Sequence, residues 1–334
     1  MRLAALVESP DHVCARYRLA AFQPSLAGAG HRLELSALPR HPWGKLTLGR
    51  LQRDADAIIL QRKLLSPIEV ALLRLRARRL LFDIDDAVWL RDSYSGKGFA
   101  SAKRMSRFRT AVRAADIVVA GNSFLAESAT EAGARATEII PTCVDVDRYP
   151  LAKHDRPQAD LVWIGSSSTL RGLEAVSEML EEIGTRVPGV RLKLICDRFL
   201  NLNQLPVIAC PWDGATEAAD IAAAEIGISW IPDDPWSRGK CGLKVLQYMA
   251  AGLPVVANPV GVQVEMVRPG ETGFLATTTA EWVEAIATLA GNPALRRKMG
   301  AAGRRQVEER YSVEAGTKRW TALLNRLNTA RASA

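Results

Sequence analysis

Residues 240–261 read KCGLKVLQYMAAGLPVVANPVG and predict, in order, a loop, a helix, a helix stop and a buried strand. Apolar residues recur at helical spacing after Lys244, Gly252 suits a left-handed helix end, and Pro254 prevents the helix from continuing. Val255–Ala257 is a short apolar run, typical of a parallel strand that is covered on both faces. We therefore expect the helix to begin at one rim of a parallel sheet.

The loop before this helix and the first helical turn are rich in glycine and positive charge, with Arg238, Gly239, Lys240, Gly242 and Lys244. A helix N-terminus carries unpaired backbone N–H groups and a partial positive charge, which favour phosphate. The pattern predicts an anion site.

A second anion-binding feature follows the predicted strand Leu161–Gly165. Ser166–Thr169 would open the next helix, and Arg171 lies one turn further on. Helix capping alone would also explain these serines.

The quoted stretch resembles the donor-site signature of family 4 glycosyltransferases of the GT-B fold. Gly261–Ala276 resembles that family's glycine turn, glutamate helix and following strand, and Ile140–Tyr149 resembles its interdomain segment. Arg171–Gly172 falls where the family has Lys-Gly. The resemblance implies an α/β protein with two Rossmann-like domains that face each other across a cleft.

The chain departs from this family at its paired-glutamate motif, whose two positions hold Gly239 and Gln247. The amide oxygen of Gln247 could still accept a hydrogen bond from a ribose. A non-catalytic partner subunit of the same fold is therefore an alternative. A nicotinamide-dependent oxidoreductase is less favoured, because neither half has Gly-x-Gly-x-x-Gly after a first strand.

The resemblance implies a hexosyl- or related glycosyltransferase of the bacterial surface-polysaccharide type. It would take a UDP- or GDP-linked sugar and retain the anomeric configuration. No metal or other cofactor is expected if Lys244, Arg171 and the helix N-terminus neutralise the leaving diphosphate. The residues assigned to donor binding are Gly165, Ser166, Arg171, Arg238, Lys240, Gly242, Leu243, Lys244 and Gln247.

Four segments are expected. Residues 1–150 would form an acceptor-binding domain, 151–158 a linker and 159–311 a nucleotide-sugar-binding domain. Residues 312–334 would form a helix that packs back on the N-terminal domain.

The N-terminal half carries its own candidate residues. The predicted strand Arg79–Asp83 runs into Asp85 and Asp86, which we assign as catalytic because strand ends of open α/β sheets collect binding residues. Strand-end capping is an alternative, and a divalent cation held by these aspartates is less favoured, so no metal site is expected. Arg16, Arg18 and Asn122 are assigned to acceptor binding.

Positive charge is concentrated in the same half. Residues 1–150 hold 23 Lys and Arg against 16 Asp and Glu, out of 44 against 36 in the chain. Such an excess suits a lipid-linked or phosphorylated acceptor and contact with an anionic membrane. The basic helix predicted at 101–115 fits either a membrane-facing helix or an ordinary surface helix. Nucleic acid is disfavoured, because no aromatic residues interleave the basic clusters.

The remaining composition favours the cytoplasm. The five cysteines show no paired spacing, the first residues do not read as a cleavable leader, and no apolar run reaches 18 residues. We expect a cytoplasmic protein with peripheral contact to the inner face of the membrane.

Overall fold

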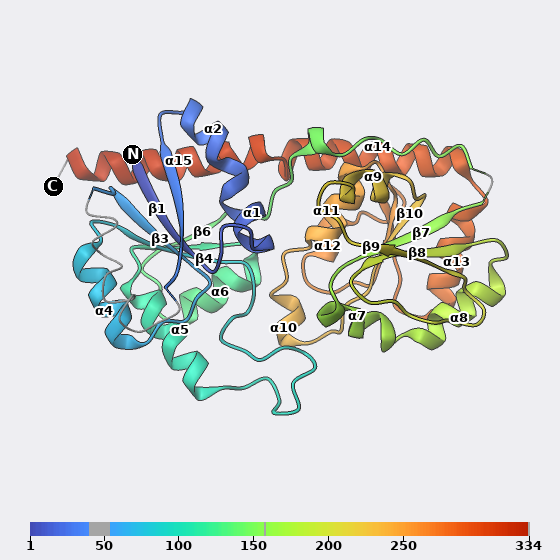
Figure 1. The fold of residues 1–334 in the computed structure, drawn as a ribbon, viewed down its shortest axis with the longest axis horizontal. Helices are drawn as coiled ribbons and strands as arrows, with labels where there is room; N and C mark the ends of the chain where they lie inside the picture. The colour runs from blue at the N-terminus through green and yellow to red at the C-terminus, as the bar shows by residue number, and fades with distance from the viewer. Residues whose placement is uncertain (40–53, 157, 333–334) are drawn as a thin grey trace. The chain divides into compact units, whose positions relative to one another are not determined.

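The computed structural model describes residues 1–39, 54–156 and 158–332. The chain divides into two compact units (Figure 1). The first comprises Met1–Cys143, Asp234–Cys241 and Val313–Ala334, and the second comprises Val144–Asp233 and Gly242–Ser312.

The first unit is built on a six-stranded parallel sheet of order β2-β1-β3-β4-β5-β6. Its central strands are apolar on both faces, as expected where helices cover both sides. The strands are β1 (Arg2–Val7), β2 (Arg32–Ala37), β3 (Ala57–Gln61), β4 (Leu80–Ile84), β5 (Ile117–Ala120) and β6 (Thr137–Ile139).

Two helical layers cover this sheet (Figure 1). One face of the sheet is covered by helices α1, η1, α2 and α15, which form one hydrophobic core with it. Helix α15 contributes Trp320, Leu323, Leu324 and Leu327 to that core. The other face is covered by helices α4, α5 and α6, which form a second hydrophobic core. The bounds are α1 (Val13–Arg18), η1 (Ala20–Phe22), α2 (Gln23–Gly28), α4 (Pro67–Arg76), α5 (Ala102–Ala114), α6 (Ser123–Glu131), α10 (Pro235–Arg238) and α15 (Val313–Ala332).

The second unit has a parallel sheet of order β12-β11-β10-β7-β8-β9. Its strands are β7 (Asp160–Ile164), β8 (Arg191–Cys196), β9 (Val207–Pro211), β10 (Ile226–Ser229), β11 (Val255–Ala257) and β12 (Gly273–Leu275). Its helices are η2 (Val146–Arg148), α7 (Ser167–Glu174), α8 (Ser177–Arg186), α9 (Glu217–Ala222), α11 (Leu243–Ala250), α12 (Gln263–Met266), α13 (Thr279–Ala290) and α14 (Pro293–Arg310). Two parallel sheets with helices on them confirm the predicted α/β fold with two Rossmann-like domains.

The stretch 240–261 folds as its local signals predict. Gly242 precedes α11 in a left-handed conformation, with φ of 66°, and Gly252 ends it with φ of 73°. Strand β11 then begins at Val255, directly after Pro254. The predicted loop, helix, stop and strand are therefore confirmed.

The two units divide the chain differently from the expected boundaries. Residues 144–150 belong to the second unit, where the Tyr149 hydroxyl accepts a hydrogen bond from Gln247 at 3.2 Å. Part of the expected linker 151–158 is fixed to the same unit, because buried His154 contacts Glu225 and the carbonyl of Gly252, each at 2.8 Å. Pro157 of that linker lies outside the described residues.

Across the described residues, no helix combines the length and apolar character that crossing a membrane requires.

Candidate functional site

The second unit has a topological switch point between β7 and β10. The strand order runs outward from β7 to β9 in one direction and from β10 to β12 in the other. Loops that follow strands on either side of such a point form the usual ligand site of an open parallel sheet. Gly165 and Ser166 follow β7, and Gly242 precedes α11, the second helix after β10 in the chain.

Lys244 and Trp163 mark this switch point. The Lys244 Nζ lies 4.1 Å from the centre of the Trp163 ring, so a β7 side chain and the first turn of α11 are in contact. The Tyr248 hydroxyl on the same helix accepts a hydrogen bond from the Ile164 N–H at 2.9 Å. These contacts hold the N-terminus of α11, with its backbone N–H groups, beside the Gly165–Ser166 loop.

The β7–α7 loop is braced by a carboxylate. The Ser167 N–H donates to Asp197 at 2.6 Å. The Ser167 side chain and this N–H together lower the pKa of Asp197. Ser166 is exposed, and so is Arg171 further along α7. The structure thus brings Gly165, Ser166, Gly242, Leu243 and Lys244 to one edge of the sheet, with Arg171 on the adjoining helix.

Gln247 is buried on α11. Its Nε2 donates to Glu217 at 2.9 Å and to the Tyr149 hydroxyl at 3.2 Å. Glu217 in turn accepts a hydrogen bond from the Trp212 indole at 2.6 Å. The amide therefore fastens α11 to its neighbours, a structural role that accompanies the ribose contact predicted for it.

Arg238 and Lys240 are placed in the other unit. The segment Asp234–Cys241 packs with the first unit, where the Lys240 Nζ lies 5.4 Å from the Trp236 ring centre. The structure does not bring these two cations together with Lys244 within one unit. Donor binding by them stays a prediction.

Gly239 shows why a glutamate is absent from this motif position. A Cβ atom at Gly239 would lie 2.8 Å from both the Cβ and the backbone nitrogen of Ala87. Such separations are too short for a side chain, and one contact is with backbone that cannot move aside. The close approach therefore requires glycine.

In the first unit, Arg18 is paired with Asp83. Its Nη2 lies 2.5 Å from Asp83 Oδ1, and its Nη1 donates to the Ile140 carbonyl. Both side chains are fully buried. The Arg18 guanidinium is thus enclosed and satisfied by protein groups, which gives Arg18 a structural role, and the acceptor-binding role stays a prediction.

Asn122 has a structural role in the first unit, and its acceptor role stays a prediction. Its Oδ1 caps α6 by accepting from the Leu125 N–H at 2.9 Å, and its Nδ2 donates to the carbonyls of Gly239 at 3.3 Å and Lys240 at 3.1 Å. Both ends of the amide are used, which ties the Asp234–Cys241 segment to the sheet. Arg16 is half-buried over Tyr17, and its acceptor role stays a prediction.

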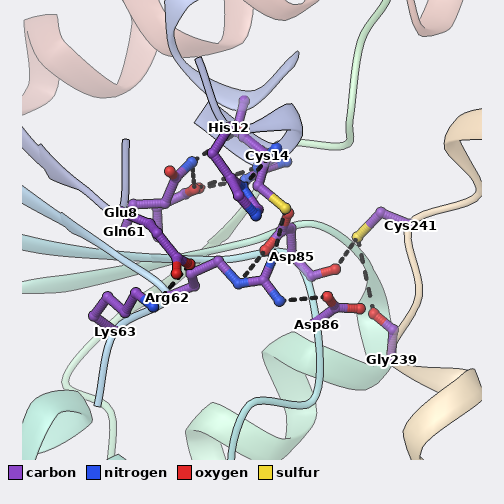
Figure 2. A network of polar contacts seen from close by, with 12 residues as sticks. Glu8, His12, Cys14, Gln61, Arg62, Lys63, Asp85, Asp86, Gly239 and Cys241 are labelled. Carbon is purple, nitrogen blue, oxygen red and sulfur yellow. Dashed lines mark hydrogen bonds and ion pairs between the residues drawn. The ribbon is translucent and has the colours of Figure 1, made fainter. Parts of the chain in front are cut away.

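Asp85 and Asp86, which follow β4, are held by Arg62 (Figure 2). The Arg62 Nη2 lies 2.7 Å from Asp86 Oδ2, and its Nε lies 3.6 Å from Asp85 Oδ1. The same guanidinium contacts the Cys14 thiol, while Cys241 donates to the Asp85 carbonyl at 3.2 Å. Asp85 Oδ1 is buried and accepts no hydrogen bond from the residues that the structure describes.

The charges of this network are set by burial. Burial and, to a smaller extent, the neighbouring Asp85 raise the pKa of Asp86, although Lys240 and Arg62 act to lower it. Burial also raises the pKa values of the Cys14 and Cys241 thiols. These cysteines therefore stay protonated, and carboxylates rather than thiolates are the proton-accepting groups here.

Arg62 and Lys63 are the functional candidates that sequence reasoning missed. They directly follow β3, at the same edge of the sheet as the aspartates after β4. The strand-end rule that selected Asp85 and Asp86 would have selected them too. Nothing in the local sequence indicates the positive φ of Arg62, 45°, that turns its backbone there.

Comparison with known proteins gives a partial match in sequence. Residues 235–306 match the family model "Glycosyl transferases group 1". A D-inositol 3-phosphate glycosyltransferase of Pseudarthrobacter chlorophenolicus is 26% identical over 186 residues, covering 49% of this chain and 44% of the relative. The chain spans less than half the length of the curated relatives it matches.

Solved structures match nearly the whole chain. Sucrose-phosphate synthase from Thermosynechococcus elongatus aligns with a TM-score of 0.78 at 16% identity, covering 98% of this chain and 99% of the other. Anabaena HepE in complex with UDP and glucose aligns with a TM-score of 0.69 at 17% identity, covering 98% and 100%. At these identities the likeness establishes the fold, and the chain has the GT-B architecture of these glycosyltransferase neighbours.

Proposed function

We propose that the protein is a glycosyltransferase that moves a hexosyl or related sugar from a UDP- or GDP-linked donor to an acceptor hydroxyl. One observation carries the proposal. Gly242, the N–H groups that open α11 and Lys244 lie together at the switch point of the second unit, an arrangement that suits an anion. These groups lie within the residues that match the glycosyltransferase model, and HepE of the same fold holds UDP and glucose.

The second unit would bind the donor. Lys244, the N-terminus of α11 and Ser166 would face the diphosphate, with Arg171 adding a second cation. Negative charge grows on the diphosphate as it leaves, and these groups would stabilise that charge without a metal ion. The amide oxygen of Gln247 would accept a hydrogen bond from the ribose.

The first unit would supply the acceptor and a base. The acceptor oxygen would bond to the anomeric carbon while the bond from that carbon to the diphosphate breaks, its electron pair going to the diphosphate. The hydroxyl proton would pass to Asp85 or Asp86, which lie together beside Arg62. Configuration would be retained at the anomeric carbon.

We assign the acceptor to the lipid-linked or phosphorylated glycans of surface-polysaccharide synthesis. Support comes from the basic first 150 residues and from one relative that carries an inositol phosphate in its name. The protein would act in the cytoplasm, in peripheral contact with an anionic membrane.

Nucleotide binding tests the donor site. Lys244→Ala should weaken the affinity for whichever of UDP and GDP binds by at least tenfold, on the order of 2 kcal/mol, because a charge-assisted contact is lost. Calorimetric titration measures this. Lys298→Ala, at an exposed lysine of α14, is the matched control and should bind normally. Equal affinities of the two variants would remove Lys244 from the donor site.

Turnover separates the proposal from its main alternative, a non-catalytic partner subunit, which is suggested by Gly239 and Gln247 at the glutamate positions. Hydrolysis or transfer should be observed with at least one sugar nucleotide from a UDP- and GDP-linked panel. Nucleotide binding with no turnover across the panel would favour the partner subunit.

A further inference from the structure

The first unit contains a basic pocket of about 570 Å³. Its lining includes Arg62, Lys63, Lys103, Arg104, Arg107 and Trp236. The volume is that of a typical small-molecule site.

The pocket lies at the switch point of the first sheet. The strand order reverses between β1 and β3, which are neighbours in the sheet. Glu8 follows β1, and Arg62 and Lys63 follow β3; all three line the pocket. Ligands of open parallel sheets bind at this place, and the donor site proposed for the second unit occupies the corresponding position there.

The charges at the pocket are only partly balanced. The Lys63 Nζ pairs with Glu8 at 2.7 Å, and Arg62 pairs with Asp86 (Figure 2). Three further cations of the pocket lie on α5 and form no ion pair among the described residues: Lys103, Arg104 and Arg107. The pocket therefore retains a positive charge.

Two of these cations are held in place by neutral groups. Arg104 Nη1 donates to the Leu90 carbonyl at 2.6 Å, and Arg107 Nη1 donates to the Leu64 carbonyl at 3.2 Å. These bonds fix the guanidinium groups without neutralising them, so less conformational freedom is lost when they bind an anion.

We propose that this pocket binds the phosphate or diphosphate group of the acceptor. Trp236, Leu64 and Val88 add an apolar wall for the part of the ligand next to that group. Arg62 lines the pocket and is also paired with Asp86. Arg62 would therefore lie between the bound anion and the predicted catalytic carboxylates. The identity of the ligand as an acceptor rests on the proposed function; the anion site itself does not.

Inorganic pyrophosphate is the probe, titrated by calorimetry with UDP at saturating concentration so that the donor site is filled. The unaltered protein should bind it in a salt-sensitive manner, and Lys103→Gln/Arg107→Gln should lose at least tenfold in affinity. Lys97→Gln/Arg109→Gln removes the same charge outside the lining and should change affinity less than threefold. No pyrophosphate binding, or equal losses in both double variants, would overturn the proposal. Lys103→Gln alone, at an exposed side chain, keeps the test available if the double variant does not fold.

Titration with farnesyl diphosphate distinguishes a lipid-linked acceptor from a soluble phosphate ester as the source of the phosphate or diphosphate group. Binding tighter than pyrophosphate supports a lipid-linked acceptor, and equal binding supports a soluble phosphate ester; both retain the pocket. Failure of UDP and GDP to bind, with no turnover of any donor, would defeat the proposed function. In that case the pyrophosphate titration, run without UDP and sensitive to Lys103 and Arg107, would still establish the anion site.

Discussion

Arg62 contacts both candidate catalytic carboxylates. Its backbone is left-handed, with φ of 45°, a conformation that costs a non-glycine residue on the order of 1 kcal/mol. The contacts to Asp85, Asp86 and the Cys14 thiol offset this cost. Burial acts to lower the pKa of Arg62, but Asp85, Asp86 and Cys14 together raise it above its usual value, so the guanidinium stays charged. Strain of this kind is usually kept where a side chain must be aimed at a site.

The raised pKa of Asp86 predicts the acid limb of the pH–rate profile. Because Asp86 must be ionised to accept a proton, kcat/KM should fall as pH drops through its pKa, above the ordinary value of 3.8. The pKa of Asp86 is higher in the folded state than the ordinary value of 3.8 expected for the unfolded state. Between these two pKa values the folded protein binds more protons than the unfolded protein, so Asp86 adds to the stability of the fold as pH falls. The loss of activity would therefore not be acid unfolding caused by Asp86.

Asp86→Asn should remove this limb and lower the plateau of kcat/KM by roughly 10²- to 10⁴-fold, as measured by steady-state kinetics across pH. Asp92→Asn, at an exposed carboxylate of the same unit, is the control. An unchanged limb in the Asp86 variant would assign the titration to another group.

At the scale of elements, α4 presents an apolar stripe that the sheet does not cover. A capping box of Ser66 and Glu69 starts the helix, and Val70 and Leu73 enter the core. Ile68 and Leu75 are 73% and 83% exposed, and their spacing of seven places them on one helix face. Helix α5, which packs beside α4, adds exposed Lys and Arg residues, so the pair combines apolar and basic surface as membrane-interface helices do.

Vesicle binding should depend on that stripe. Ile68→Ser/Leu75→Ser should reduce sedimentation with phosphatidylcholine vesicles containing phosphatidylglycerol, most clearly at low salt. Leu151→Ser/Val264→Ser removes two exposed apolar side chains of the second unit and should sediment normally. Equal binding by both variants would show that α4 does not face the membrane.

Local signals predicted the elements that need no distant partner. Helix α11 carries its own start and stop, so Gly242, Gly252 and Pro254 sufficed to predict it. The segment Asp234–Cys241 could not be assigned in this way. Its position depends on the Asn122 amide and on the close approach of Gly239 to Ala87, contacts across more than 100 residues of chain. Sequence patterns contain no signal for such contacts, so the structural role of Asn122 could not be predicted.

At the scale of the whole molecule, neither unit is one continuous piece of chain. The first takes Asp234–Cys241 and α15 from distant parts of the sequence. Its core beneath β1 and β3 includes Trp320, Leu323 and Leu324, all nearly free of solvent exposure. The first unit should therefore depend on residues that follow the second one in the sequence.

Truncation after Ser312 tests this dependence. Removing α15 deletes four large apolar side chains and exposes the apolar residues that they cover in the first unit. Each buried side chain of this kind is worth roughly 2 kcal/mol, so the loss approaches the whole stability of a typical domain. Hydrogen exchange measured by mass spectrometry should show β1 and β3 losing protection while β7 and β10 keep it, and UDP binding should persist. A chain ending at Leu327 retains all four side chains and should behave like the full protein. Loss of protection in both units after the first truncation would mean that they fold as one cooperative body, and that donor binding cannot be separated from the integrity of the first unit.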